Sequence, residues 1–181
     1  MRLAILPFAF ALAFAPAAFA QLPKSTEVPA GQMAQSDVDF MHAADAANVD
    51  QMTFAARIEG NTISNLKSMA KDVGASHRKA DIALRLLAAN KHVELSHEMT
   101  PRAQQEADQL IKRDLPTDKM YAENLVRDNQ DLIAMYERAR NESPDPDIRQ
   151  YAETMLPALK HNERLASDFL ARNGIKTADQ Q

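Results

Sequence analysis

A stripe of apolar residues between positions 63 and 87 constrains the fold of this chain more than any other feature. Its members are spaced alternately three and four residues apart, as on one face of an α-helix that packs against other helices. They are Ile63, Leu66, Ala70, Val73, His77, Ala80, Leu84 and Leu87. Only His77 is polar. The pattern predicts a buried helix with one buried histidine near its middle.

Three further stretches carry a similar stripe, at residues 36–58, 117–141 and 146–172. Each stripe is again apolar except for one residue near its middle. In chain order these exceptions are Gln51, Asn129 and Asn162. The chain therefore predicts four long helices, each with one hydrogen-bonding side chain on its buried face.

Capping and stop signals delimit these helices. Ser36 with Asp39 three residues later predicts the first helix start, and Gly60 predicts its end. Asp145 before Pro146 predicts the start of the last helix, and Thr100 before Pro101 predicts a short helix at 101–113. The short turns between the helices of each pair make antiparallel neighbours.

These elements predict an all-α fold. We expect a ferritin-like four-helix bundle, in which two antiparallel hairpins are joined by a long crossover that carries a short helix. The chain of 181 residues is long enough for one domain with a substantial core. We assign residues 36–173 to the helical bundle domain and 174–181 to a disordered tail.

The first twenty residues have the pattern of a signal peptide. Arg2 is followed by an apolar run to residue 19, and Ala18-Phe19-Ala20 is a cleavage site before Gln21. A membrane anchor is the alternative, but the run is short and contains two prolines. We therefore predict a signal peptide at 1–20, a flexible leader at 21–35 and export to the bacterial periplasm.

Composition excludes several classes of function. The chain has no cysteine, which excludes disulfides, thiolate metal sites, thiol nucleophiles and a lipid anchor on cysteine. Its formal net charge is −4 at pH 7, and it has no basic block. We therefore expect no nucleic-acid partner, and we find no stretch after the signal peptide that predicts a membrane span.

The polar exceptions of the four stripes lie at similar heights. Within each hairpin, the two polar residues lie at distances from the shared turn that differ by about 4 to 5 residues, or about 6–8 Å of helix rise. We interpret them as one buried layer whose members hydrogen-bond one another and fix the pairing of the helices. A pocket for a small ligand is a second interpretation, and a metal site is a third. The layer residues are Gln51, His77, Asn129 and Asn162.

Two other groups of residues are weaker candidates for a site. The predicted loop at 91–99 contains residues that could bind copper, although solvated loop residues are the better interpretation. These are His92, Glu94, His97 and Met99. The acidic residues Asp81, Glu106 and Asp108 lie off the predicted buried stripes.

Several short motifs resemble those of the exported bacterial proteins grouped as domain of unknown function 4142 (DUF4142), which are placed among the ferritin-like folds. The motifs are Phe40, His77-Arg78-Lys79-Ala80, Asp118-x-x-Tyr121 and Leu156-Pro157-x-Leu159. The resemblance covers about residues 36 to 169. The order and spacing of these motifs imply the same four-helix fold and an exported protein.

The resemblance also implies a comparison at the layer positions. The family pattern has an inward glutamate in the first helix and an inward histidine in each of the others. Here those positions are Gln51, His77, Asn129 and Asn162, so only the histidine is kept. A carboxamide is a neutral and weak ligand, so we expect no transition metal in the bundle core, and no cofactor.

We therefore predict a protein that is not an enzyme and acts through binding or an interaction. Its partner would be a small molecule or another protein, and the periplasmic setting is what the resemblance implies. The alternative is a ferritin-like metal-binding protein or oxidoreductase with a degenerate metal site.

Overall fold

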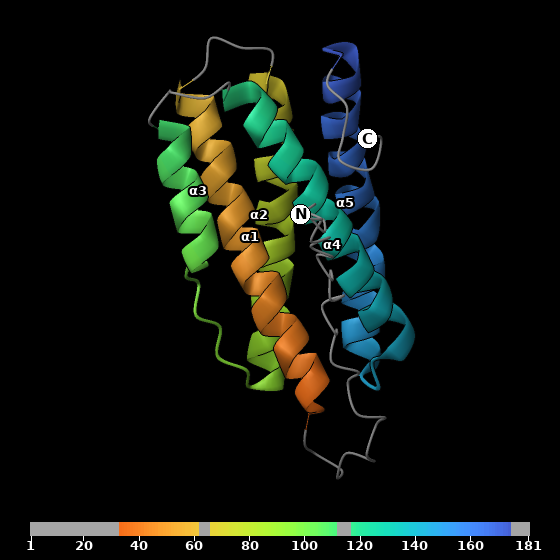
Figure 1. Cartoon of the computed structure of the whole chain (residues 1–181). Helices are drawn as coiled ribbons and strands as arrows, with labels where there is room; N and C mark the ends of the chain where they lie inside the picture. The colour runs from red at the N-terminus through yellow and green to blue at the C-terminus, as the bar shows by residue number, and fades with distance from the viewer. Residues whose placement is uncertain (1–32, 62–65, 112–116, 175–181) are drawn as a thin grey trace, which may run out of the picture. The chain divides into compact units, whose positions relative to one another are not determined.

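The computed structural model describes residues 33–61, 66–111 and 117–174, and within these ranges the regular structure is all helical. The helices are α1 (Gln35–Asn61), α2 (Leu66–Lys91), α3 (Pro101–Ile111), α4 (Thr117–Glu142) and α5 (Pro146–Arg172) (Figure 1). They belong to one compact unit, Gly31–Gln181. The predicted signal peptide, most of the predicted leader, Ile63 of the α2 stripe and almost all of the predicted tail lie outside the described residues.

The helices form two hairpins, as predicted. Neighbouring helices run in opposite directions, and the most extensive contacts are within the pairs α1–α2 and α4–α5 (Figure 1). Helix α2 also packs on α5, and α1 packs on both α3 and α4. Helix α3 lies in the connection between the two hairpins. The all-α prediction is confirmed.

The ends of the helices show where local signals decide the boundary. Asp145 caps α5, because its Oδ1 accepts hydrogen bonds from the backbone N–H groups of Asp147 at 2.8 Å and Ile148 at 3.4 Å. The predicted cap of α1 is wrong. The helix begins at Gln35, and the carbonyl of Ala34 accepts the N–H of Asp37 at 3.0 Å, so Ser36 lies inside the helix.

The predicted stop at Gly60 is also wrong, because α1 continues to Asn61. Glycine inside a helix costs only about 1 kcal/mol relative to alanine, which the packing of the preceding turn can offset. Ile58, two residues earlier, is 1% exposed. Gly174, by contrast, follows α5 with a φ of +67°, which is the left-handed conformation expected at a glycine stop.

A close approach of α1 and α2 depends on Gly74. A Cβ atom at this position would lie 3.1 Å from the Cβ of Ala55, which is closer than most such contacts. The missing side chain therefore lets the two helices of the first hairpin pack tightly at the level of residue 74.

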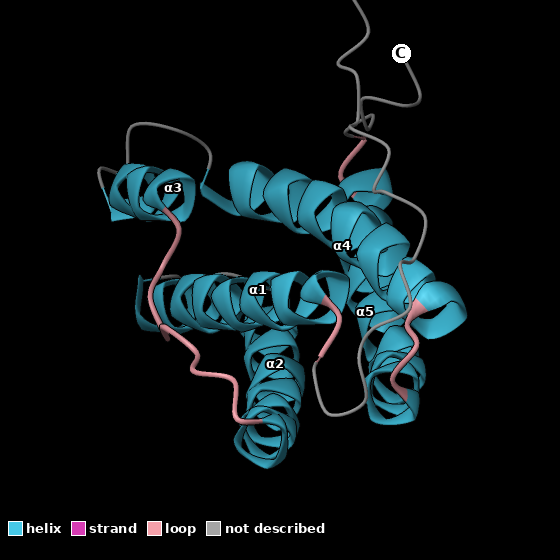
Figure 2. Cartoon of the chain, turned by 90° about the horizontal axis from the view of Figure 1, so that it is seen from below, coloured by secondary structure: helices cyan, strands magenta, loops and turns pink. Residues whose placement is uncertain are grey.

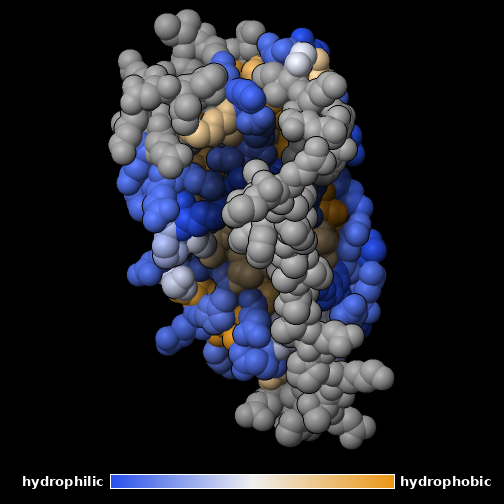
Figure 3. All heavy atoms as spheres, in the orientation of Figure 1, coloured by the Kyte–Doolittle hydropathy of each residue, from blue (hydrophilic) through white to orange (hydrophobic). Residues whose placement is uncertain are grey.

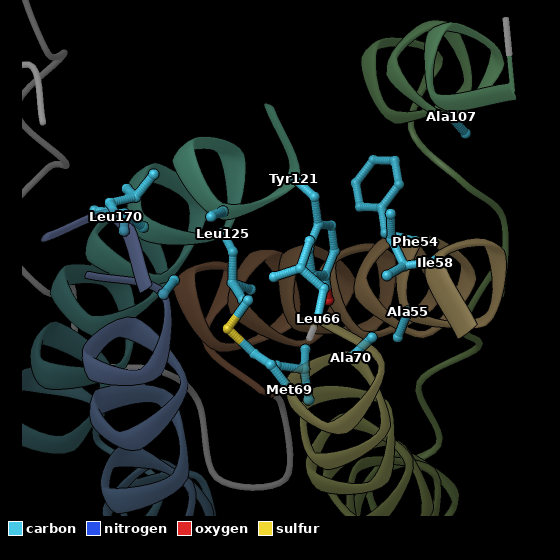
Figure 4. Close-up of a cluster of buried hydrophobic side chains, with 14 of the residues drawn as sticks. Phe54, Ala55, Ile58, Leu66, Met69, Ala70, Ala107, Tyr121, Leu125 and Leu170 are labelled. Atoms are coloured by element: carbon cyan, nitrogen blue, oxygen red, sulfur yellow. The ribbon is translucent and has the colours of Figure 1, made fainter. Parts of the chain in front are cut away.

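Two apolar clusters form the core. The first joins all five helices and includes Phe54, Ile58, Leu66, Tyr121, Leu125 and Leu170 (Figure 4). The second includes Phe40, Met41, Leu84, Tyr136, Ile148 and Tyr151. Along every long helix, the polar exception of the stripe falls between the residues of one cluster and those of the other. A polar section therefore separates two apolar halves of the bundle.

The outer surface is mainly polar. The face seen in Figure 3 is largely hydrophilic over the described residues, with apolar atoms visible between polar side chains. None of the helices that the structure describes is both long enough and apolar enough to cross a membrane. The larger exposed apolar side chains of the described part are Ile82 and Leu86, one turn apart on α2.

Candidate functional site

The polar section between the clusters contains more residues than the sequence predicted. All four predicted layer residues are buried, with exposures of 3% for Gln51, 2% for His77, 0% for Asn129 and 1% for Asn162. The structure adds Asp45 and Asn48 from α1 and Asp81 from α2, which are also buried. We call these seven residues the polar interior. They are Asp45, Asn48, Gln51, His77, Asp81, Asn129 and Asn162.

The four predicted residues do not hydrogen-bond one another in the described part of the chain. Gln51 donates to the Oδ2 of Asp128 at 3.1 Å, and Asn129 donates to the carbonyl of Leu125, on its own helix, at 2.8 Å. Asn162 donates to the Oγ of Ser76 at 2.9 Å. The polar interior is therefore not the mutually bonded layer that the spacing indicated.

Gln51 belongs to a charged network at the edge of the bundle. Its partner Asp128 also accepts a 2.6 Å hydrogen bond from Arg102 of α3. Arg102 in turn donates to Glu106 at 3.1 Å. Gln51 therefore helps to hold α1, α3 and α4 together through its amide nitrogen, while its Oε1 has no hydrogen-bond partner among the described residues.

His77 is bound by a residue that the sequence analysis did not select. Its Nδ1 lies 3.0 Å from the Oδ1 of Asn48 on the facing helix. Because an amide oxygen only accepts, Nδ1 carries the proton and Nε2 is left as an acceptor. Burial lowers the pKa of His77 from 6.5 to about 4, so the imidazole is neutral at pH 7.

A small cavity adjoins His77. It measures about 10 Å³, close to the least that one water molecule needs. Asn48, Ser76, Tyr136 and Asn162 are among the residues that line it with His77. Three buried polar atoms of these residues have no hydrogen-bond partner in the described part: His77 Nε2, Asn48 Nδ2 and Asn162 Oδ1. The cavity suits a water molecule or a single ion and is too small for an organic ligand.

Two tyrosines close the polar interior on the side of α4 and α5. The hydroxyl of Tyr151 lies 3.2 Å from the hydroxyl of Tyr136 and donates to the carbonyl of Ala80 at 3.2 Å. Burial raises the pKa of both phenols, so both stay protonated at neutral pH. Phe40 packs edge-on against Tyr136, with ring centroids 5.0 Å apart.

Asp81 and Asp45 bring two carboxylates into the bundle. Asp81 is 6% exposed, so the prediction that it lies off the buried face is wrong. The buried face of α2 is wide enough to include the residue beside Ala80. The Oδ2 of Asp81 accepts a 2.8 Å hydrogen bond from Arg85. Asp45 is 0% exposed, and its Oδ2 accepts the backbone N–H of His97 at 2.9 Å.

The loop between α2 and α3 runs past α1 (Figure 2). Hydrogen bonds fix it on α1 at two points. One is the contact of His97 with Asp45. At the other, Thr100 donates to Asp50 from its backbone N–H at 3.0 Å and from its hydroxyl at 2.8 Å. Thr100 also accepts the N–H of Ala103 at 3.1 Å, which confirms it as the cap of α3.

The loop residues weighed as a copper site do not gather into one group. His92 and Glu94 are exposed, whereas the ring of His97 lies against Asp45. Among the histidine, aspartate and glutamate residues that the structure describes, one group of three has ligand atoms all within 4.8 Å of one another. It consists of Asp45, Asp81 and His97.

Comparisons with known proteins bear on the fold and the family. A crystal structure of a DUF305 fragment from Deinococcus radiodurans is similar, with a TM-score of 0.68 and 14% sequence identity, over 77% of this chain and 98% of that chain. At that identity the likeness shows the fold alone. No curated protein matches. The sequence model of the family described as Domain of unknown function (DUF4142) matches residues 22–169, most of the chain. The chain therefore belongs to the DUF4142 family.

Proposed function

We propose that this protein is a non-catalytic binding protein of the bacterial periplasm, and that the polar interior of a ferritin-like bundle is its binding site. The observation that supports the proposal is a set of buried polar atoms without hydrogen-bond partners in the described residues. They are Asn48 Nδ2, Gln51 Oε1, His77 Nε2, Asp81 Oδ1, Asn129 Oδ1 and Asn162 Oδ1, together with Asp45 Oδ1, which accepts no hydrogen bond but lies 2.8 Å from the ring Nδ1 of His97. Polar groups that serve only packing are normally paired, because each unpaired one costs about 1–3 kcal/mol.

The state of His77 favours binding over catalysis. A general base works best with a pKa near the pH of its surroundings, and burial moves the pKa of His77 down to about 4. Its Nδ1 is bound to an amide, and the nearby hydroxyl of Ser76 donates to the carbonyl of Val73 at 2.8 Å. No nucleophile is activated by this histidine within the described part of the chain.

The charges and the available space select the class of ligand. Asp45 and Asp81 are buried carboxylates, which disfavour an anionic ligand and favour a cation. The cavity beside His77 has room for about one water molecule, so an organic molecule would have to separate the helices. The proposed ligand is therefore small and polar.

Export is expected to produce a mature chain that begins at Gln21. The basis is the cleavage signal Ala18-Phe19-Ala20 after an apolar run. Intact mass spectrometry of the protein in a periplasmic fraction measures this directly. Recovery of the uncleaved chain in the membrane fraction would contradict the periplasmic part of the proposal.

Binding is expected to show as extra mass on the folded protein. Native mass spectrometry of the purified, exported protein should detect a small species that disappears on denaturation. The double variant Asp45→Asn, Asp81→Asn, which removes both buried negative charges, should lose it. Asp108→Asn is the matched control, because Asp108 is an exposed carboxylate of α3. A bare polypeptide mass for the unaltered protein would contradict the binding role.

A further inference from the structure

Asp45, Asp81 and His97 converge from three segments of the chain. Asp45 is on α1, Asp81 is on α2, and His97 is in the loop that follows α2. One ligand atom of each lies within 4.8 Å of the other two. Two ligand atoms on opposite sides of a metal ion, each bonded at about 2.0–2.4 Å, lie about 4.0–4.8 Å apart. The three side chains are thus close enough to bind one ion without a change of fold.

The two carboxylates are buried without full compensation. The side chain of Asp45 is 0% exposed and that of Asp81 is 8% exposed. The Oδ1 atom of each carboxylate accepts no hydrogen bond from the described residues. Arg85 binds the other oxygen of Asp81, but its own side chain is 49% exposed. Buried carboxylate oxygens without donors are costly, and a cation removes that cost.

The contact of His97 with Asp45 brings an imidazole nitrogen and a carboxylate oxygen side by side. His97 Nδ1 lies 2.8 Å from Asp45 Oδ1, which makes an ion pair when the ring is protonated and places two potential ligand atoms together when it is neutral. Two ligand atoms bonded to one zinc ion at about 2.1 Å and at the tetrahedral angle lie about 3.4 Å apart, so the ring and the carboxylate would separate by only about half an ångström to hold the ion. Each then directs its lone pair at the ion and away from the other.

The backbone around His97 supports this placement. His97 has a φ of +54°, a conformation that non-glycine residues adopt at some cost. Its N–H binds Asp45 Oδ2 at 2.9 Å, which holds the loop while leaving Asp45 Oδ1 available. A contact of this kind orients a metal ligand from outside the coordination sphere. The His97 side chain is 36% exposed, which gives an ion a route from solvent.

We infer that Asp45, Asp81 and His97 form a binding site for one divalent transition-metal ion, with Zn²⁺ as the best match. Two carboxylates balance the charge of the ion, and an imidazole favours zinc over calcium or magnesium. The His97 side chain is partly exposed, so one side of the site faces solvent, from which water can add as a further ligand. This inference rests on the proposed binding role and names its ligand. The inference departs from the sequence-based expectation of no metal in the bundle core. That expectation rested on the four layer positions, and the proposed site uses none of them.

Zinc binding tests the inference. The full-length gene product is purified, stripped with a chelator and titrated with Zn²⁺ by calorimetry. We expect one equivalent to bind, and the melting temperature to rise by about 5 °C or more at a hundredfold excess over Kd. His97→Ala and Asp81→Asn should each weaken binding by about 100-fold or more, since even residues that only orient metal ligands are worth about 10–100-fold.

His92→Ala is the matched control. His92 lies in the same loop, is exposed and has a similar φ of +56°, but it is not part of the group. It should leave zinc affinity unchanged. Because His97 is at the surface, its variant should keep the helical circular dichroism of the unaltered protein. Equal loss of affinity in both histidine variants would overturn the assignment of His97.

Other outcomes separate this inference from the proposed function. Absence of stoichiometric Zn²⁺ binding, or tighter binding of Ca²⁺ than of Zn²⁺, would overturn the site. If native mass spectrometry still showed a bound species other than a metal ion, the binding role would stand without the metal. If the exported protein had a bare mass and also failed to bind Zn²⁺, both proposals would fail together.

Discussion

Acidification from pH 7 to pH 4 is expected to remove about 3 kcal/mol of stability through His77 alone. Burial lowers the pKa of this imidazole from 6.5 to about 4 in the folded protein. Below pH 6.5 His77 is protonated in the unfolded chain, whereas in the folded protein it stays neutral down to about pH 4. The free energy of unfolding therefore falls as the pH falls through this window. Each pKa unit corresponds to about 1.4 kcal/mol, and the two values differ by about 2.5. Urea unfolding at several pH values between 7 and 4 measures the loss.

Comparison with His77→Gln isolates the contribution of this histidine. The variant cannot take up the proton, so its stability should fall by about 3 kcal/mol less over the same range. His161→Gln, on the exposed face of α5, should retain the pH dependence of the unaltered protein. Asp37 and Asp50 contribute with the opposite sign, because burial raises their pKa values. Identical pH profiles for His77→Gln and the unaltered protein would contradict the prediction.

Most of the fold could be predicted from the periodic stripes of apolar residues. Helix α5 has the predicted bounds, because Asp145 and Pro146 fix its start locally and Gly174 follows its end. The start of α1 was missed because Ser36 has the right type for a cap, but the backbone carbonyl of Ala34 already serves the first turn. A side-chain cap is one of several ways to satisfy free N–H groups, and the sequence does not reveal which is used.

The burial of the layer residues was predictable, whereas their partners were not. Burial follows from the face of a helix, which the spacing gives directly. A hydrogen bond requires placement to a fraction of an ångström, which depends on how the helices rotate and slide. His77 therefore binds Asn48, one turn from the predicted Gln51. The spacing of Asp81 four residues after His77 on one helix was a usable signal for a second buried group.

The sequence indicated His97 as a possible copper ligand of the loop, but no pattern indicated its contact with Asp45. His97 lies in a loop without periodicity. Its position is set by contacts with Asp45, which is 52 residues away in the sequence. The loop is held by Asp45 and Asp50, five residues apart on α1. In the sequence alone, nothing distinguishes Asp45 and Asp50 from the other acidic residues of this helix. Only the fold brings them to the same loop.

His77→Leu is expected to destabilise the protein by about 1–3 kcal/mol, even though leucine fits an apolar seam. The substitution removes the donor to Asn48 and leaves the buried Oδ1 of that amide unpaired. Asn48→Leu should cost a similar amount, because it leaves Nδ1–H of His77 without an acceptor. The double variant should cost less than the sum by about 1–3 kcal/mol, since neither polar partner then remains. Chemical denaturation of the four proteins of this cycle measures the coupling.

Asn129→Leu supplies the control for this cycle. Asn129 is equally buried, but its amide donates to the carbonyl of Leu125 on its own helix and makes no hydrogen bond to His77. Its effect should therefore add to that of His77→Leu within about 0.5 kcal/mol, as expected for residues that share no partner. Equal coupling of His77 with Asn48 and with Asn129 would mean that the polar interior acts as one mutually bonded layer after all. A coupling confined to Asn48 would instead show that the histidine and this amide form a separate pair between the helices of the first hairpin.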